Sequence, residues 1–443
     1  MHLKINTLKK QIFLFCLNVI TTISFSQNGN WYKGDLHSHS RYSDGSSSVS
    51  SIIANAESKG FTFYVLTDHD KTYTSNPGNP IHWKDTAYHS NKMILLYGTE
   101  WTTNNGHACI WNSKPFIYDS IFQANKLGQP DKAAEIGKGQ GGIFSVNHPL
   151  SGSLRWEYNY NFEFQSLEIL NGPFSYLPSN NKNVITTVWE PLLLSGKRIT
   201  AVGGSDMHYL NSWLTSFLPN LGSPTTYVFS NQNNAEGIID GIKKGHVCIS
   251  NSPSEPHLDF FADIHQNNQF NFMMGDEIAD TNSLIIFKVN LIGKQNNLTF
   301  QVIKNGILLN NHTFSISAAD SSIEFSDIPG QKSYYRIELL SNGNPVSWTN
   351  PIYFGYETRT IAYVNSNSEL SKIEIYPNPT NDDVYIRNKT NESINIKLYN
   401  VTGEVLVQVS TYDETIKIDL ETYSRGIYFI KINDGKSYKV IKQ

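Results

Sequence analysis

Short apolar segments recur along the first half of the chain, and each one runs directly into polar residues. Segments of four to six apolar residues bounded by turn residues are typical of buried strands. The segments, each with the polar residues after it, are 61–66 with His69 and Asp70, 93–97 with Glu100, 143–146 with Asn147 and His148, 167–170 with Asn171, and 199–202 with Asp206 and His208. Coincidence could give one or two such endings, but it explains five of them poorly.

A helical period separates the first two polar clusters. Val49, Ile52, Ile53 and Ala56 are spaced i, i+3, i+4 and i+7, and Ser48 is suited to cap the start. The pattern therefore predicts a helix from Ser48 that ends before a glycine at position 60. Strands that alternate with helices and end in polar residues predict a (β/α) barrel, whose chemistry lies at the carboxyl ends of its strands.

The hydrophobic pattern changes near residue 256. Apolar and polar residues alternate in segments 284–289, 298–303 and 334–339, and Asn305-Gly306 is a hairpin signal. These features predict a β-sandwich over residues 257–356. Residues 357–371, rich in Asn and Ser, are interpreted as a linker, and residues 372–443 are again predicted to be all-β.

The stretch from Gly34 to Gly45 carries the densest candidate chemistry. His37 and His39 stand two residues apart, so on an extended strand their imidazoles point to the same face. Asp44 follows in a Ser/Gly-rich turn, from which its carboxylate can reach the same centre. Two imidazoles and a carboxylate that converge are a candidate metal site.

The N-terminus adds a prediction about location. A basic patch precedes an apolar run that continues to about Phe25, and Ser24-Phe25-Ser26 resembles a cleavage site, so residues 1–26 are predicted to be a signal peptide. The run is too short for a transmembrane span. The chain has 443 residues and a formal charge of −4, and loss of Lys4, Lys9 and Lys10 leaves −4 − 3 = −7. A mildly acidic protein is a poor general binder of nucleic acid.

Two cysteines, Cys109 and Cys248, remain after the predicted signal peptide is removed. An exported chain of this length with two cysteines does not depend on a disulfide framework. One bridge between them and a pair of buried free thiols are both compatible with the sequence, and we expect the free thiols.

Taken together, these motifs resemble the PHP (polymerase and histidinol phosphatase) superfamily. The matching segments, in the order of that family, are Asp35-Leu36-His37-Ser38-His39, Ser43-Asp44-Gly45, Thr67-Asp68-His69, Glu100, Asn147-His148-Pro149 and Ser205-Asp206-Met207-His208. The resemblance covers roughly residues 31–256, and the branch it resembles is the CehA/McbA-like metallohydrolases, which carry a β-domain after the barrel. It implies a distorted seven-stranded (β/α) barrel over residues 27–256.

Carried over position by position, the resemblance implies three metal positions. The first takes His37, His39, Glu100 and Asp206; the second takes Asp44, His69 and His208; the third takes Glu100, His107 and His148, with Glu100 bridging. His107 is also compatible with a turn that enters a strand, in which case the site is binuclear. Mixed histidine and carboxylate ligands suit Mn, Fe or Zn better than Mg.

The implied activity is hydrolysis of a small-molecule phosphomonoester or phosphodiester by metal-bound hydroxide. Three divalent ions carry +6 and three carboxylates carry −3, and the remaining +3 matches a phosphate ester plus hydroxide. Arg41 is a candidate phosphate ligand and Asp70 a candidate catalytic residue beside His69. The alternative is an amide, carbamate or carboxylic-ester hydrolase with an aromatic pocket drawn from Trp101, Trp111, Trp156 and Trp189. A surface binding protein with a relic barrel is a third class, against which the intact ligand set argues.

The C-terminal segment has its own signature. Residues 373–379 (IEIYPNP), 426–430 (GIYFI) and 439–443 (KVIKQ) resemble the type A sorting domain of the type IX secretion system. A small carbohydrate-binding β-module is the alternative. The resemblance implies type IX secretion machinery as a partner and a secreted or surface-attached protein.

Overall fold

The computed structural model describes residues 29–70, 82–116, 121, 124–125, 127–172, 183–210, 220–293, 297–316, 322–356, 373–388, 393–433 and 437–443. The predicted signal peptide and the predicted linker lie outside these residues. The chain divides into two compact units, residues 1–360 and 361–443, and each is considered by itself.

A five-stranded mixed sheet supports most of the candidate site. Its strands, in spatial order, are β4 (Tyr97–Thr103), β5 (Gly106–Asn112), β6 (Ile143–Val146), β7 (Ser166–Asn171) and β8 (Thr200–Gly204). β4, β5 and β6 pair antiparallel, whereas β6, β7 and β8 pair parallel. β5 to β8 are buried along their whole length, and the parallel strands β6, β7 and β8 end at one edge. A two-stranded parallel sheet joins β2 (Phe63–Tyr64) and β3 (Ile94–Leu95).

Within the described residues, the helices of the first unit are α1 (Val49–Ser58), α3 (Pro130–Gly139), α6 (Glu190–Leu194) and α7 (Ala235–Lys244), with 3-10 turns η1 (His82–Lys84) and η2 (Gly152–Leu154) and the π-helix η3 (Ile185–Trp189). The helix predicted after Ser48 is confirmed, since the Ser48 side chain caps α1 and Val49, Ile52, Ile53 and Ala56 are buried. Because a single turn joins β4 to β5, no helix separates these two strands.

A nine-stranded sheet crosses the predicted boundary near residue 256. Its main path is β1 (Asn30–Gly34), β9 (Thr225–Ser230), β10 (Val247–Ser250), β19 (Asn344–Thr349), β18 (Ser333–Ser341), β15 (Leu298–Lys304) and β16 (Ile307–Ile316), with β13 (Glu277–Ile278) and β20 (Ile352–Phe354) attached at β18. The crossing is the antiparallel pair β10–β19, where Ile249 lies opposite Trp348. Hydrogen bonds join strands on the two sides of residue 256, so the sheet is continuous there. A domain boundary at this residue stays a prediction.

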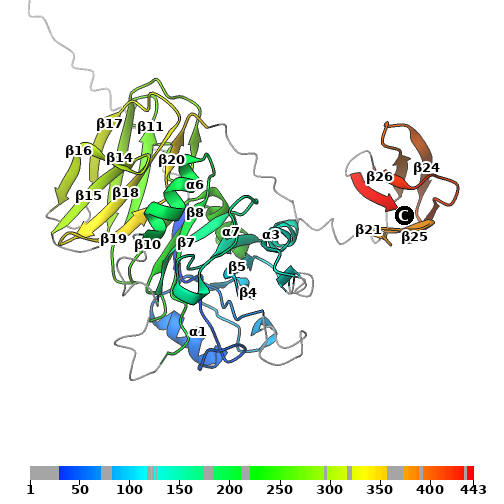
Figure 1. Cartoon of the computed structure of the whole chain (residues 1–443), viewed down its shortest axis with the longest axis horizontal. Helices are drawn as coiled ribbons and strands as arrows, with labels where there is room; N and C mark the ends of the chain where they lie inside the picture. Colours follow the sequence, from blue (N-terminus) through cyan, green and yellow to red (C-terminus); the bar gives the residue numbers. More distant parts are fainter. Residues whose placement is uncertain are drawn as a thin grey trace, which may run out of the picture. The chain divides into compact units, whose positions relative to one another are not determined.

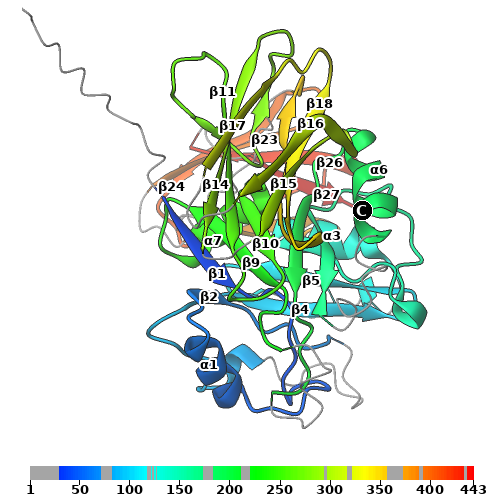
Figure 2. The same cartoon turned by 90° about the vertical axis from the view of Figure 1, so that its left-hand side faces the viewer.

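A second sheet faces the far part of the nine-stranded one (Figures 1 and 2). Its strands are β12 (Phe272–Met273), β11 (His257–Asp263), β14 (Ile285–Ile292) and β17 (Ser322–Asp327). Phe260, Phe287, Phe300 and Phe354 belong to the apolar core shared by the two sheets. Alternation of buried and exposed positions in β14 and β15 is the pattern of strands with one covered face.

Two buried polar contacts fasten the sandwich to the ligand-bearing half. Asn350 accepts a hydrogen bond from Ala201 N (2.8 Å) and donates to the carbonyls of Ala201 and Val247 (both 2.9 Å). The Arg336 guanidinium, which is 2 % exposed, pairs with Glu190 of α6 and with Glu338. Asn350 thus takes the place of a neighbouring strand along part of β8.

A closed (β/α)7 barrel is not confirmed. The described strands of the ligand-bearing half are shared among a five-stranded mixed sheet, a two-stranded sheet and the edge of the nine-stranded sheet. The protein is predominantly β, with several sheets. The predicted strand at 93–97 is divided: Glu100 lies in the middle of β4 and does not follow a strand end.

The C-terminal unit is a small two-sheet structure. Its sheets are β21 (Ile373–Tyr376), β22 (Asp383–Asn388) and β25 (Thr415–Asp419), and β24 (Val405–Thr411), β23 (Ile394–Tyr399), β26 (Gly426–Ile432) and β27 (Ser437–Lys442). It has its own apolar core, which includes Val384, Ile396, Leu398 and Ile430. No helix in the described part of the chain is long and apolar enough to cross a membrane.

Candidate metal centre

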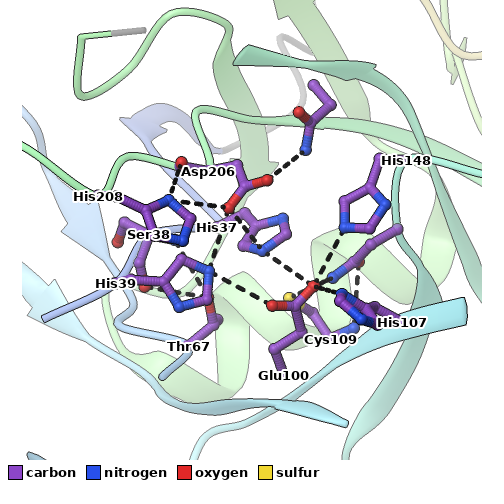
Figure 3. Close-up of polar contacts among 12 residues, drawn as sticks. His37, Ser38, His39, Thr67, Glu100, His107, Cys109, His148, Asp206 and His208 are labelled. Atoms are coloured by element: carbon purple, nitrogen blue, oxygen red, sulfur yellow. Dashed lines mark hydrogen bonds and ion pairs between the residues drawn. The ribbon is translucent and has the colours of Figure 1, made fainter. Parts of the chain in front are cut away.

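The sequence-predicted ligands converge on one region, where the ion pairs of Glu100 and of Asp44 meet. Figure 3 labels His37, His39, Glu100, His107, His148, Asp206 and His208 there. His37 and His39 come from the segment after β1, His69 from the segment after β2, and Asp206 and His208 from the segment after β8. Glu100 and His107 lie within the β4–β5 hairpin, and His148 follows β6. Elements far apart in the sequence therefore deliver their polar side chains to one place.

Glu100 lies at the hub of this arrangement. Its Oε1 lies 3.3 Å from nitrogens of His37, His107 and His148. Its Oε2 lies 3.4 Å from His39 Nε2 and 3.0 Å from His69 Nδ1. Five imidazoles around one carboxylate that is 1 % exposed form the setting of a bridging ligand.

A second group of ligand atoms surrounds Asp44. Its Oδ2 lies 3.2 Å from His208 Nε2 and 3.4 Å from His69 Nε2, and its Oδ1 lies 3.6 Å from His39 Nδ1. His39, Asp44, His69 and His208 are close enough to hold one ion, as are His37, His39 and Glu100, and also His69, Glu100 and His107. Asp206 Oδ1, 3.1 Å from His39 Nε2 and 3.4 Å from His37 Nε2, adjoins the second of these groups.

Two of the candidate ligands have unusual backbones. His148 has φ = 26° and Asp206 has φ = 48°, a region that side-chain-bearing residues rarely adopt. The Asp206 segment is held by Asp35, which accepts hydrogen bonds from Ser205 N (3.0 Å) and Gly222 N (2.7 Å). Strained residues of this kind persist where the surrounding structure fixes them, and they cluster at functional sites.

The donor atoms fit metal ions. The Nε2 atoms of His37 and His39 are buried and have no hydrogen-bond partner of good geometry among the described residues, although carboxylate oxygens lie 3.1–3.4 Å away. A buried polar atom without a partner is costly, and these two are aimed at Glu100 and Asp206. Imidazole nitrogens and carboxylate oxygens that point at a shared space are the donor set of Mn, Fe and Zn sites.

The imidazoles of the site differ in pKa: some are lowered and others are raised from the ordinary value. Burial, together with positive charge on His208 and His69, lowers the pKa of His39 to about 4. For His208 the burial is outweighed by Asp44 and Asp206, which raise its pKa to about 9. Burial of Glu100 is likewise outweighed by His37, His69 and His107, so its pKa lies well below the usual value. Because some imidazoles hold protons in the absence of metal, metal binding will release protons.

Glu168 is a residue that the sequence interpretation passed over. It lies in β7, is 3 % exposed, and its Oε1 lies 3.0 Å from His37 Nδ1. Its Oε2 accepts hydrogen bonds from His148 N (2.8 Å) and Asn171 Nδ2 (3.0 Å). The available signal was an acidic residue within the otherwise apolar Leu167–Leu170 segment, since a buried carboxylate needs partners.

Asp68 is another buried carboxylate close to the ligands. It accepts hydrogen bonds from Ser40 N, Ser40 Oγ and Ser43 Oγ, each at 2.7 Å, and its Oδ2 lies 3.0 Å from His82 Nδ1. These bonds hold the turn that carries Asp44. His82 therefore reaches the site through Asp68 and not as one of the converging nitrogens.

The two candidate catalytic residues lie in different surroundings. Asp70 is fully buried, accepts hydrogen bonds from Thr102 N (2.8 Å) and Asn125 Nδ2 (2.6 Å), and burial raises its pKa to about 8. Arg41 is exposed, and its Nε donates to the Ser46 carbonyl (2.9 Å). A catalytic role for either residue stays a prediction.

Other side chains considered from the sequence belong to the packed interior. Cys109 and Cys248 are free and buried, as expected. Trp101, Trp111 and Trp189 are at most 1 % exposed, and Trp156 is 7 % exposed. All four belong to the large apolar core, so they offer little surface for an aromatic substrate pocket.

The C-terminal unit has known relatives. Residues 374–443 match the family described as secretion system C-terminal sorting domain. This unit is a sorting domain. Beta-agarase A of Zobellia galactanivorans is 40 % identical to the chain over 70 residues, which are 16 % of this chain and 13 % of that protein. The chain thus spans only a small part of that curated relative. The sorting domain indicates the type IX secretion route and marks the chain as a secreted or cell-surface protein.

Two solved structures resemble the rest of the chain more distantly. One is a two-domain protein from Bacteroides vulgatus described as containing a predicted PHP-like metal-dependent phosphoesterase, with a TM-score of 0.39 and 13 % identity over 73 % of this chain and 96 % of that one. The other is a candidate metal-dependent phosphoesterase from Bifidobacterium adolescentis, with a TM-score of 0.28 and 16 % identity over 42 % of this chain and 90 % of that one. Similarities at these TM-scores support no conclusion about the chemistry of this chain.

Proposed function

We propose that the chain is a secreted, multinuclear metal-dependent phosphoesterase of the PHP type. The observation that carries the proposal is the position of Glu100, whose two oxygens lie within 3.4 Å of nitrogens from five imidazoles. One carboxylate cannot satisfy five ring nitrogens by hydrogen bonding alone. Cations that share this carboxylate would accept the lone pairs of the ring nitrogens directly.

The candidate ligands form three sets, each of which would hold one ion. His37, His39, Glu100 and Asp206 would hold the first, Asp44, His69 and His208 the second, and Glu100, His107 and His148 the third. When bound, such cations supply a water molecule whose pKa falls to about 7 and a Lewis acid that polarises a phosphoryl oxygen. The buried carboxylates keep the imidazoles in place and exclude bulk water from their nitrogens.

Charge supports an anionic substrate. Three divalent ions would carry +6, and the ligand carboxylates Asp44, Glu100 and Asp206 would carry −3, which leaves +3. A phosphate monoester dianion together with one hydroxide matches that charge, whereas a neutral ester or carbamate with one hydroxide leaves +2 uncompensated. Arg41, exposed in the segment between His39 and Asp44, would add a fork of donors for phosphate oxygens.

A panel of substrates tests the proposal. The full chain, freed of metal by chelation and then reloaded with Mn²⁺, Fe²⁺ or Zn²⁺, is assayed with nitrophenyl phosphate, bis-nitrophenyl phosphate and nitrophenyl acetate. We expect metal-dependent turnover of at least one phosphoester that exceeds turnover of the acetate ester. Faster metal-dependent turnover of the acetate ester, or of a nitrophenyl carbamate, would contradict the proposal and favour the carbonyl hydrolase.

A further inference from the structure

We propose that Glu168 is a positioning residue that couples the first and third metal positions. The inference rests on the metal centre of the proposed function but not on its substrate. No ligand set predicted from the sequence includes Glu168. Its carboxylate nevertheless contacts a ring atom of one candidate ligand and the backbone of another, and these two ligands belong to different positions.

The contact with His37 sets the tautomer of that ring. Glu168 Oε1 lies 3.0 Å from His37 Nδ1, where a carboxylate oxygen accepts a hydrogen bond from the ring. In the neutral, ligating form of His37 the hydrogen therefore lies on Nδ1, which leaves the Nε2 lone pair directed toward Glu100 and Asp206. A carboxylate behind a ligating imidazole fixes the ring orientation and raises its basicity.

The contact with His148 holds a strained backbone. His148 has φ = 26°, and its N–H donates to Glu168 Oε2 at 2.8 Å. This backbone conformation directs the imidazole toward Glu100, where His148 Nε2 lies 3.3 Å from Oε1. Without the charged acceptor, the N–H of His148 would be buried without a strong partner and the ring would lose its anchor.

The surrounding residues keep the Glu168 carboxylate in place. Asn171 Nδ2 donates to Glu168 Oε2 (3.0 Å) and lies 3.2 Å from Asp206 Oδ2, so a single amide joins the positioning carboxylate to a ligand. Position 204 needs a glycine, because a Cβ there would lie 2.5 Å from Glu168 Oε1 and 2.4 Å from His37 Cβ. Glu168, His37, Asn171 and Asp206 therefore form one tightly packed network.

Replacement by glutamine isolates the effect of the carboxylate. The Glu168→Gln side chain has nearly the same size but one acceptor oxygen, so either His37 Nδ1 or His148 N must face an NH₂ group. If His37 is the residue affected, its hydrogen moves to Nε2 and blocks the lone pair. We expect affinity at the first and third positions to fall about 10–100-fold, the usual effect of losing a carboxylate behind a ligand. The position of Asp44, His69 and His208 should keep its affinity.

The test measures metal binding by the full chain. Metal-free protein is titrated with Co²⁺ against a chelator, and visible absorption follows the number of ions and their coordination. Asp263→Asn is the matched control, since Asp263 of β11 is also buried and accepts two hydrogen bonds, from His265 N (2.9 Å) and Asn268 N (2.7 Å), but contacts no candidate ligand. We expect Glu168→Gln to lose the tight binding and the absorption of two positions, and Asp263→Asn to retain both.

Every outcome bears on the inference. Parental Co²⁺ affinity and spectrum in Glu168→Gln would overturn it, and so would an equal loss in Asp263→Asn. If Glu168→Gln does not fold, as judged by circular dichroism, the same Co²⁺ titration is made on Asn171→Ala, which removes a hydrogen bond to Glu168. Weaker Co²⁺ binding would support the coupling of the first and third positions through Glu168, and unchanged Co²⁺ binding would refute it. A protein that binds Co²⁺ as expected but hydrolyses no phosphoester would refute the proposed function and leave the role of Glu168 intact.

Discussion

His69 and Glu100 form an isolated parallel β-bridge, and the Nδ1 atom of His69 lies 3.0 Å from Oε2 of Glu100. Main-chain hydrogen bonds from Glu100 N to Asp68 O (3.2 Å) and from Asp70 N to Glu100 O (2.9 Å) fix this register. The hub carboxylate is thus placed by the backbone, so changing its side chain alters the chemistry of the site more than its architecture.

Glu100→Gln should remove metal without unfolding the chain. The neutral amide cannot bridge cations, and we expect a loss of at least one bound ion. Loss of one group that stabilises transition-state charge costs about 2.7–4 kcal/mol, so turnover should fall roughly 100–1,000-fold. Metal analysis and phosphoester turnover measure both effects. Glu157→Gln, which alters an exposed carboxylate paired with Arg155, should match the parent; an unchanged Glu100→Gln would refute the hub assignment.

His107→Ala should distinguish a phosphoester site from a carbonyl site. His107 Nδ1 lies 3.3 Å from Glu100 Oε1, and His107 is not among the four residues grouped around Asp44. We expect two ions to remain and phosphoesterase turnover to fall about 100–1,000-fold, because a phosphoryl oxygen loses one charge contact. Hydrolysis of a carboxylic ester, which needs one Lewis acid, should suffer less. Parental metal content and phosphoesterase rate in this variant would remove the third position.

His257 should make the first unit less stable in acid. Its ring stacks on Tyr227 with centroids 4.2 Å apart, and burial, with a smaller contribution from Lys33, lowers its pKa from 6.5 to about 4. The unfolded chain therefore binds more protons between pH 4 and pH 6.5, so the free energy of unfolding falls as the pH drops through that window. The greatest effect is about 3 kcal/mol.

His257→Phe provides the measurement. Phenylalanine keeps the ring but cannot be protonated, so its melting temperature should fall less than that of the parent between pH 6.5 and pH 4.5. Both proteins are compared in chelator, which removes the contribution of bound metal. Equal slopes of melting temperature against pH in the two proteins would show that His257 is not the group responsible.

Deletion of residues 372–443 should leave the first unit intact. The sorting domain has its own core and forms a compact unit separate from residues 1–360. We expect the truncated recombinant protein to keep its melting temperature for the first unit, its metal content and its turnover, while the native host fails to export or display it. Lost turnover in a folded truncated protein would mean that the tail contributes to the site.

Some site residues were accessible from the sequence because local pattern determines them. His37 and His39 follow from their i, i+2 spacing, and His148 and Asp206 follow apolar strands. Glu168 was missed because its role depends on a contact with His37 from 131 residues away, which no local pattern encodes. From the sequence, His107 could lie in a turn or in a strand. Its pairing with Thr102 in the β4–β5 hairpin places it in a strand.

Individual strands and their order along the chain could be predicted from the sequence. The pairing of strands that are far apart in the sequence could not. Alternation in segments 284–289 and 298–303 gave the sandwich strands, which are confirmed as β14 and β15. The pairing of Ile249 with Trp348 links strands nearly a hundred residues apart. Such long-range pairs depend on packing and loop-closure entropy, not on periodicity, so the barrel expectation left out the strand that lies beside β10.

The support that Asn350 gives to β8 comes from a part of the chain that follows all the candidate ligands. During synthesis every candidate ligand from His37 to His208 leaves the ribosome before Asn350, whose side chain completes the hydrogen bonding of β8 at Ala201. The hydrogen bonding along this part of β8 is therefore complete only when the later sandwich segment is present. A fragment that ends before residue 350 would contain every candidate ligand and still lack this support of β8.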